Sequence, residues 1–150
     1  MPDFDKNFLE AKGLPVNYKD WELIRTDRIP VKKDFSGTLR IISTDSEWLQ
    51  GVNIKVNGKM TILGCEGQRF ILWADDVLKD GSVHFSGTSK DSLLFVWNAC
   101  DIRGNRSANS WQNGAAMIVE VNGNTRRYRC NDFAPDEDFD DLIFEVTIDE

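Results

Sequence analysis

The residues of this chain best suited to chemistry are tryptophans placed among polar side chains. Trp111 lies in a long polar segment, 101–113, and Trp48 follows the acidic run 45–47. The face of a sugar ring stacks on such aromatic surfaces while neighbouring amides and arginines bond its hydroxyls. The sequence therefore predicts a glycan-binding loop, with packing of both tryptophans over the ends of a core as the alternative. The candidate ligand residues are Trp111, Asn109, Gln112, Arg103, Arg106 and Trp48.

Charge is distributed unevenly along the chain. The net charge is −7, and residues 130–150 hold nine acidic side chains and no Lys or Arg, which leaves +2 on residues 1–129. Five arginines against two acidic residues make the stretch 99–129 basic, so it is the natural counter-surface of the acidic segment. Docking within one molecule and head-to-tail docking between copies both satisfy this pattern. The candidate partner-contact residues are Arg126, Arg127, Arg129, Asp136, Glu137, Asp138, Asp140 and Asp141.

Calcium is an alternative role for the acidic segment, because carboxylate oxygens are its preferred ligands. The candidates are Asp136, Asp138 and Asp140, although the spacing does not match an EF-hand loop. No other cofactor is predicted. The chain has one histidine, His84, in an alternating context typical of a surface-facing strand position, and it lacks both a Gly-x-Ser-x-Gly elbow and a phosphate-binding glycine loop. We expect no catalytic residues, and thus no enzyme.

The three cysteines, Cys65, Cys100 and Cys130, include no Cys-x-x-Cys pair. We therefore expect these cysteines to be buried in strands, where they act as small hydrophobic residues, and we expect neither a zinc site nor a disulfide framework.

Two Val-Asn-Gly segments dominate the local structural signals. Residues 54–58 and 119–123 each place Asn-Gly within an alternating apolar and polar run, which favours an antiparallel hairpin. Burial of Met60 and Ile62 with the residues before the first turn predicts a three-residue loop there. The second segment predicts a two-residue loop, Asn122-Gly123, with Arg127 and Arg129 facing outward.

Further strands are predicted at 36–42, at 69–73 and at 142–148, with a helical turn after residue 74. The nearly continuous apolar run 92–97 predicts a central strand covered on both faces. Residues 28–31 belong at a sheet edge, because Pro30 cannot donate to a ladder. At 150 residues the chain fits one domain, which we divide into an N-terminal arm, 1–20, and a sandwich, 21–150.

These segments resemble the galactose-binding-domain-like jelly rolls. The resemblance covers residues 36–148 and rests on Asp45-Ser46-Glu47 leading to Lys55-Val56-Asn57-Gly58-Lys59, on residues 77–81, and on residues 91–98. It implies an all-β, antiparallel β-sandwich of jelly-roll type with a short N-terminal arm. Such domains are similar to carbohydrate-binding modules and to accessory modules of virus particles, and they are mostly non-catalytic. Several of them carry a structural calcium.

Function is less constrained than fold. The sequence begins without a secretory signal and holds no long apolar run, so we expect synthesis in a cytoplasm and no membrane insertion. The overall acidity disfavours nucleic acid as a partner. The first hypothesis is a non-catalytic structural module of a larger homomeric assembly, such as a decoration, tail or baseplate protein of a bacteriophage virion. The alternatives are a carbohydrate-binding module that uses the 101–113 loop and an acidic inhibitor or immunity protein.

Overall fold

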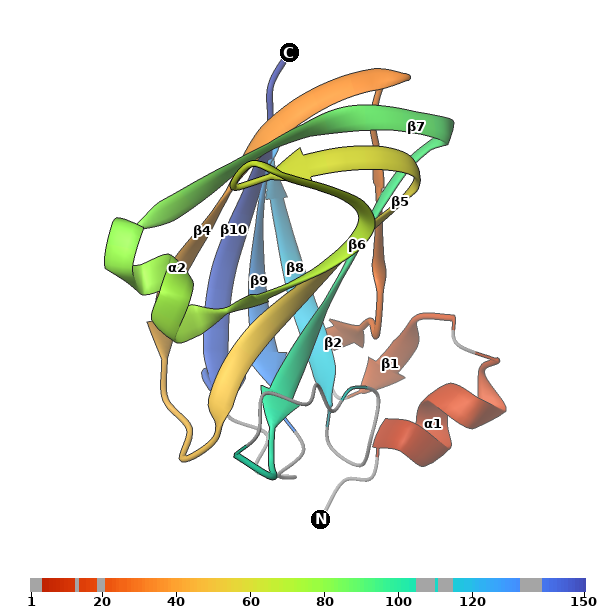
Figure 1. Ribbon diagram of the computed structural model, residues 1–150. Helices are drawn as coiled ribbons and strands as arrows, with labels where there is room; N and C mark the ends of the chain where they lie inside the picture. The colour runs from red at the N-terminus through yellow and green to blue at the C-terminus, as the bar shows by residue number, and fades with distance from the viewer. Residues whose placement is uncertain (1–3, 13, 19–20, 105–109, 111–114, 133–138) are drawn as a thin grey trace.

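The computed structural model describes residues 4–12, 14–18, 21–104, 110, 115–132 and 139–150. Strands form most of this part of the chain, and two short helices accompany them (Figure 1). The helices are α1 (Phe4–Glu10) and α2 (Ala74–Asp80). The strands are β1 (Val16–Tyr18), β2 (Trp21–Leu23), β3 (Asp27–Pro30), β4 (Asp34–Thr44), β5 (Leu49–Ile62), β6 (Cys65–Trp73), β7 (Ser82–Asp101), β8 (Ala116–Asn122), β9 (Thr125–Asn131) and β10 (Leu142–Ile148).

Every strand pair is antiparallel within the described residues. The main sheet has the order β6-β5-β7-β4-β10-β9-β8, with β3 also paired to β7, and β1 and β2 form a small separate sheet. This confirms the predicted all-β, antiparallel sandwich with a short N-terminal arm. As expected from Pro30, β3 lies at an edge and pairs only with β7. The predicted strand 142–148 is β10, and the predicted helical turn is α2.

β7 is the central strand and joins the two layers. Its first half pairs with β4, its second half pairs with β3, and β5 follows it along almost its whole length. The change of partner falls between Ser89 and Ser92, where Ser92 has a positive φ of 59°. A strand that changes partners at an irregular position turns the corner between two sheets. The sheet thus curls, and Ile24 meets Met117 of β8 through two backbone hydrogen bonds of 2.9 and 2.8 Å.

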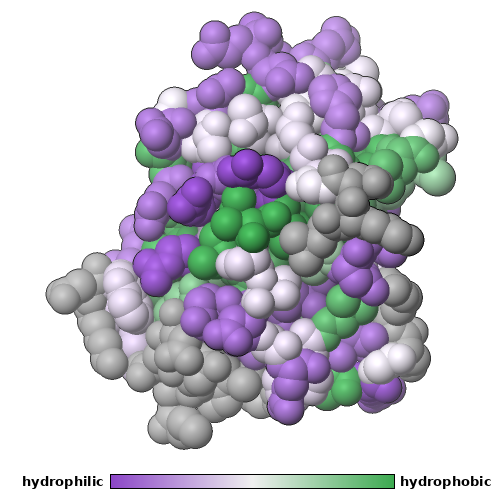
Figure 2. Space-filling view, turned by 90° about the vertical axis from the view of Figure 1, so that its left-hand side faces the viewer, coloured by the Kyte–Doolittle hydropathy of each residue, from purple (hydrophilic) through white to green (hydrophobic). Residues whose placement is uncertain are grey.

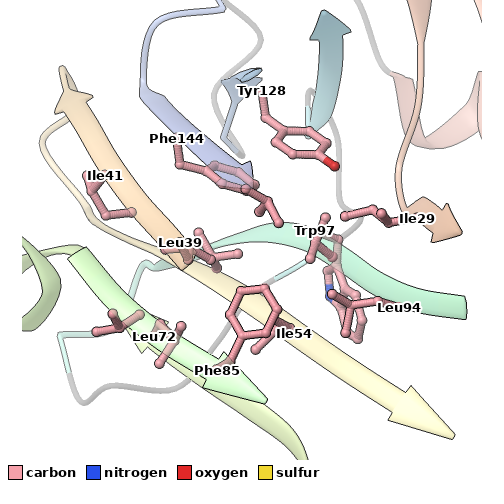
Figure 3. Packing of buried hydrophobic residues seen from close by; sticks show 14 of the residues in the cluster. Ile29, Leu39, Ile41, Ile54, Leu72, Phe85, Leu94, Trp97, Tyr128 and Phe144 are labelled. Atoms are coloured by element: carbon pink, nitrogen blue, oxygen red, sulfur yellow. The ribbon is translucent and has the colours of Figure 1, made fainter. Parts of the chain in front are cut away.

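The curled sheet encloses one large apolar core. Inward positions alternate along β4, β5, β7, β9 and β10, so Leu39, Ile54, Phe85 and Phe144 are fully buried. Figure 3 shows Tyr128 beside Phe144, and their rings stack with centroids 4.6 Å apart. A second cluster anchors the N-terminal arm. It contains Phe4, Phe8, Leu23, Ala116 and Phe139, all essentially buried.

The first predicted hairpin is wrong. β5 continues through Asn57-Gly58 without reversing, and the reversal comes at Leu63-Gly64, where Ile62 pairs with Cys65. A three-residue loop and an uninterrupted strand both keep even-numbered residues on one face, so the apolar pattern could not separate them. Glycine is required at position 58 because the backbone of β7 passes very close to it. A Cβ on Gly58 would overlap the carbonyl oxygen of Thr88 on β7.

The second hairpin is present, but its turn lies one residue later than predicted. Asn122 pairs with Thr125, so Gly123 and Asn124 form the loop, with Gly123 at a positive φ of 63°. Asn124 is held by β10, since its backbone and side chain both bond Ile148. The faces of the strands are as predicted, and Arg127 lies opposite Glu120 on the outside.

The cysteine prediction is partly wrong. Cys100 and Cys130 are buried in strands, but Cys65 is exposed because it opens the edge strand β6 directly after a turn. All three are free thiols. His84 is exposed on β7, as predicted.

The close approach at Gly58 predicts the cost of a small substitution. We expect Gly58→Ala to lower the free energy of unfolding by about 2 to 3 kcal/mol, because the added methyl must displace backbone. Gly67→Ala is the matched control. Its Cβ would lie 3.4 Å from the Phe70 ring, and we expect a loss under about 0.5 kcal/mol. Chemical denaturation of both variants measures the difference, and equal losses would contradict the assignment.

The turn at Leu63-Gly64 predicts a stabilising substitution. Leu63 has a φ of 52° and is 68% exposed, and both loop residues have positive φ, as in a type I′ turn. Asparagine adopts this conformation more readily than leucine. We expect Leu63→Asn to raise the free energy of unfolding by about 1 kcal/mol. A thermal melt that shows no gain would mean that this turn is not strained.

Candidate functional site

One end of the sandwich combines buried polar side chains with the loops that carry the predicted ligand residues. The β4–β5 connection, the end of β7 and the approach to β10 meet there, at the lower end in Figure 1. Seven polar side chains of the described residues, from β5 and from the ends of β7 and β9 as well as from these connections, are nearly inaccessible to solvent. They are Gln50, Asn53, Asn98, Asp101, Asn131, Asp132 and Asp141. Buried polar groups need hydrogen-bond partners, so this end is ordered by a network rather than by apolar packing.

Asp132 is the centre of this network. Its carboxylate accepts hydrogen bonds from the Ser46 hydroxyl at 2.5 Å and from Gln50 Nε2 at 3.1 Å. Its backbone N–H donates to Asp141 Oδ2 at 2.9 Å. Gln50 Nε2 also donates to the carbonyl oxygen of Trp48, and the Trp48 N–H donates to Ser46 Oγ. The network thus fixes the backbone of the loop that presents Trp48.

Asn131 ties β7 and β9 to the approach to β10. Its carbonyl oxygen accepts a 2.7 Å hydrogen bond from Asn98 Nδ2, and its Oδ1 accepts one of 2.8 Å from the Phe139 N–H. Phe139 has a positive φ of 53° and a buried ring in the second cluster. We call the buried polar side chains Gln50, Asn98, Asn131, Asp132 and Asp141 the polar floor. Through Phe139, the polar floor is joined to the packing of the N-terminal arm.

Two buried atoms of the floor have no partner within the described part of the chain. These are Gln50 Oε1, an acceptor, and Asn131 Nδ2, a donor. An unmet buried polar group costs about 1 to 3 kcal/mol. Ordered water commonly satisfies such groups. Both atoms are buried, so neither is open to a ligand at the surface.

The structure brings some of the predicted ligand residues to this end. Trp48 is half-buried above the network, and Arg103 is exposed just beyond β7. The other ligand candidates, Trp111, Asn109, Gln112 and Arg106, lie outside the described residues. So do Asp136, Glu137 and Asp138 of the acidic segment. Of the remaining acidic candidates, Asp140 is half-buried and Asp141 is buried.

The three arginines predicted as partner contacts fall on opposite faces of β9. Alternation turns Arg126 inward, where its Nη1 lies 2.9 Å from Asp27 Oδ2. Arg127 faces outward and binds Glu145 of β10 at 2.9 Å, and Arg129 is half-buried on the same outer face. These two ion pairs join Arg126 and Arg127 to strand residues of this chain rather than to the segment 136–141.

Arg127 belongs to a row of alternating charge on the outer face of the sheet. In register, Arg40, Glu145, Arg127 and Glu120 follow one another across β4, β10, β9 and β8. Arg40 and Arg127 both lie 2.9 Å from the Glu145 carboxylate. Burial alone would raise the pKa of Glu145, but the hydrogen bonds from Arg127 and Arg40 outweigh it and lower that pKa. Figure 2 shows one side of the molecule, on which hydrophilic residues surround an apolar area near the centre and further apolar residues lie toward the edges of the view.

Sequence analysis missed a second polar cluster, inside the sandwich. The carboxylate of Asp27 accepts the Tyr128 hydroxyl at 2.5 Å and Arg126 Nη1 at 2.9 Å. Asp27 is about a hundred positions from Arg126 and Tyr128 in the sequence, so no local motif could predict this contact. Tyr128 is fully buried, and burial, followed by the charge of Asp27, raises its pKa well above the ordinary value.

The described residues offer no ready-made metal centre. Within them, no three His, Cys, Asp or Glu side chains gather so as to hold a metal ion. Calcium binding at Asp136, Asp138 and Asp140 stays a prediction, because the first two lie outside the described part of the chain. The described helices are also too short and too polar to cross a bilayer.

Comparison of the chain with protein-family models, with curated protein sequences and with solved structures found no match in any of the three.

The Tyr128–Asp27 contact predicts a pH dependence. An unfolded tyrosine ionises near pH 10, whereas folded Tyr128 keeps its proton because its pKa is raised. The folded state then binds more protons above about pH 10, so the free energy of unfolding falls as pH rises further. Tyr128→Phe should show a smaller fall between about pH 9 and pH 11. The same variant should lose roughly 1 to 2 kcal/mol at neutral pH, because Asp27 loses one donor. Denaturation curves at each pH test both effects, and parallel pH profiles for the two proteins would contradict the first.

Proposed function

We propose that this chain is a non-catalytic structural and interaction module of a larger homomeric assembly, and that the assembly is a bacteriophage virion, with the chain as a decoration, tail or baseplate component. The observation that carries the proposal is a docked N-terminal arm with exposed leucines. Leu9 is 69% exposed and Leu14 is 57% exposed.

The arm is anchored firmly on its own molecule. Phe4 packs edge-on against Tyr18, with centroids 5.0 Å apart, and lies 6.1 Å from Phe139. Phe8 is 1% exposed beneath the guanidinium of Arg25, 4.8 Å away. A helix of seven residues would not persist alone in water, so these contacts hold it in place. The body therefore presents the leucines in a fixed position, which favours a contact with a partner surface.

Charge supports contacts between identical copies. The acidic C-terminal segment and the arginines of the region 99–129 belong to the same chain. Arg126 and Arg127 are paired within the molecule, whereas Arg103 is exposed, so in head-to-tail contact Arg103 can face the acidic segment of a second copy. The outer charge row places charged side chains on this sheet face, which is compatible with a polar, reversible contact. The jelly-roll resemblance adds support, since accessory modules of virus particles are similar.

Oligomeric state tests the proposal directly. Light scattering after size exclusion should show an assembly of the wild-type chain that grows with concentration. Leu9→Glu combined with Leu14→Glu should raise the dissociation constant at least about tenfold, because two apolar contacts are replaced by charges. Leu63→Glu is the matched control, since it changes an equally exposed leucine on the β5–β6 turn. A wild type that stays monomeric at every concentration, or a double variant that assembles like the control, would contradict the proposal.

A carbohydrate-binding module is the second candidate, and the polar loop end favours it. There Trp48 is half-buried and Arg103 exposed, close to the hydrogen-bonded side chains of Ser46, Gln50 and Asp132. A sugar needs this combination of an aromatic face and polar partners. Glycan-array binding that is reduced by Trp48→Ala and by Trp111→Ala, but not by Phe70→Ala on β6, would support this candidate. An array without hits, or hits unchanged by these substitutions, would remove it.

A further inference from the structure

A cavity of about 540 Å³ opens where the curled sheet fails to close. It lies between β8 and the segment that leads from β2 into β3. Its walls include Ile24, Asp27, Arg28, Val119 and Arg126. This volume lies within the range of small-molecule sites, which often occupy the mouths of barrel-like sheets. It is separate from the polar loop end described above.

The cavity follows from the topology. Ile24 pairs with Met117 at a single position, after which the chain turns and β3 pairs with β7 instead of β8. Val119 lies two residues beyond Met117, so its backbone N–H and C=O point toward the same edge of β8. Beyond Met117, this edge has no strand partner in the described part of the chain. The gap thus combines apolar side chains with open backbone groups.

The polar wall of the cavity has unused donors. Arg126 gives one hydrogen bond, from Nη1 to Asp27, although a guanidinium carries five N–H groups. Arg28 is exposed, and its side chain makes no hydrogen bond or ion pair with any described residue. Asp27 is already bonded by Arg126 and by the Tyr128 hydroxyl. Its negative charge is therefore largely compensated.

The balance of charge favours an anion. Arg28 and Arg126 lie on the lining together with Glu22 and Asp27, and the charge of Asp27 is already compensated by the Tyr128 hydroxyl and Arg126, which leaves the exposed guanidinium of Arg28 and the remaining N–H groups of Arg126 for a ligand. Arginine binds carboxylates in a planar, two-pronged arrangement that combines charge with direction. The lining also includes the apolar side chains of Ile24 and Val119, so a ligand that is anionic at one end and apolar at the other meets both kinds of group.

We propose that this cavity binds a small organic carboxylate. Its carboxylate is held by Arg28 and Arg126, and its apolar body lies against Ile24 and Val119. This function is additional to assembly and does not depend on it.

Titration followed by two-dimensional amide NMR tests the site on the full chain. The probes are phenylacetate, hexanoate and phenyl phosphate, with phenylacetamide as the neutral counterpart of the first. We expect saturable shifts at Ile24, Arg28 and Val119 with phenylacetate or hexanoate. Arg28→Gln should weaken binding about tenfold, because one charge-assisted contact is lost. Arg28 is exposed and unpaired by side-chain contacts, so this variant should keep its fold, which its melting temperature verifies.

Arg103→Gln is the control, since it removes an exposed arginine at the other end of the sandwich. Its binding should match the wild type. Equal binding of phenylacetamide, or equal weakening by both arginine substitutions, would overturn the proposal. So would binding of phenyl phosphate in preference to both carboxylates. The absence of saturable shifts at the cavity with every probe up to about 10 mM would also overturn it.

Discussion

The pairing of β5 with β7 is the contact on which the rest of this structure depends. β7 holds β4 with its first half and β3 with its second, so it can serve both layers only by bending. The bend requires unusually close backbones. A Cβ on Gly58 would overlap the carbonyl of Thr88, and one on Gly87 would overlap the carbonyl of Lys59. Just beyond them, Ser89 Oγ accepts the N–H of Leu93 and steadies the irregular stretch of β7.

The curl of the sheet produces two regions of different character. At the loop end lies the polar floor, in which the Asp132 carboxylate accepts hydrogen bonds from two side chains and its backbone N–H donates to the Asp141 carboxylate. At the seam beside β8, the sheet stops short of closure and leaves a cavity next to Asp27. In both regions a buried or half-buried carboxylate receives two donors, which offsets the cost of taking its charge out of water. A rigid apolar core lies between them and keeps both in place.

The N-terminal arm links the loop end to the surface. Phe139 belongs to the second apolar cluster with Phe4 and Phe8, and its backbone N–H bonds Asn131 in the polar floor. A change in the position of the arm would therefore shift Phe139, which lies just before β10. The arm and the hydrogen-bond network around Asn131 are thus connected through Phe139.

The class of fold could be predicted from the local sequence, because apolar and polar residues alternate along each half-buried strand. The apolar positions of 36–42, 92–97 and 142–148 identified three strands correctly, and Pro30 placed β3 at an edge. The alternation of odd-numbered and even-numbered positions also predicted correctly which residues of β8 and β9 face inward and which face outward. It failed at Asn57-Gly58, since an odd-length loop and a continuous strand leave the same residues buried. Only the close approach of β7 decides between them there.

The sites were less accessible to sequence reasoning. Local composition drew attention to Trp48 and Arg103, and the tertiary structure does place both at the polar loop end. Nothing local connects Asp27 with Arg126 and Tyr128, which meet only because the curled sheet brings β3 over the inner face of β9. By itself, then, the sequence determined which residues point inward along each strand, since that depends on neighbours along the chain. Which inward residues meet, and where the sheet stays open, was decided only by the way the strands pair over long separations.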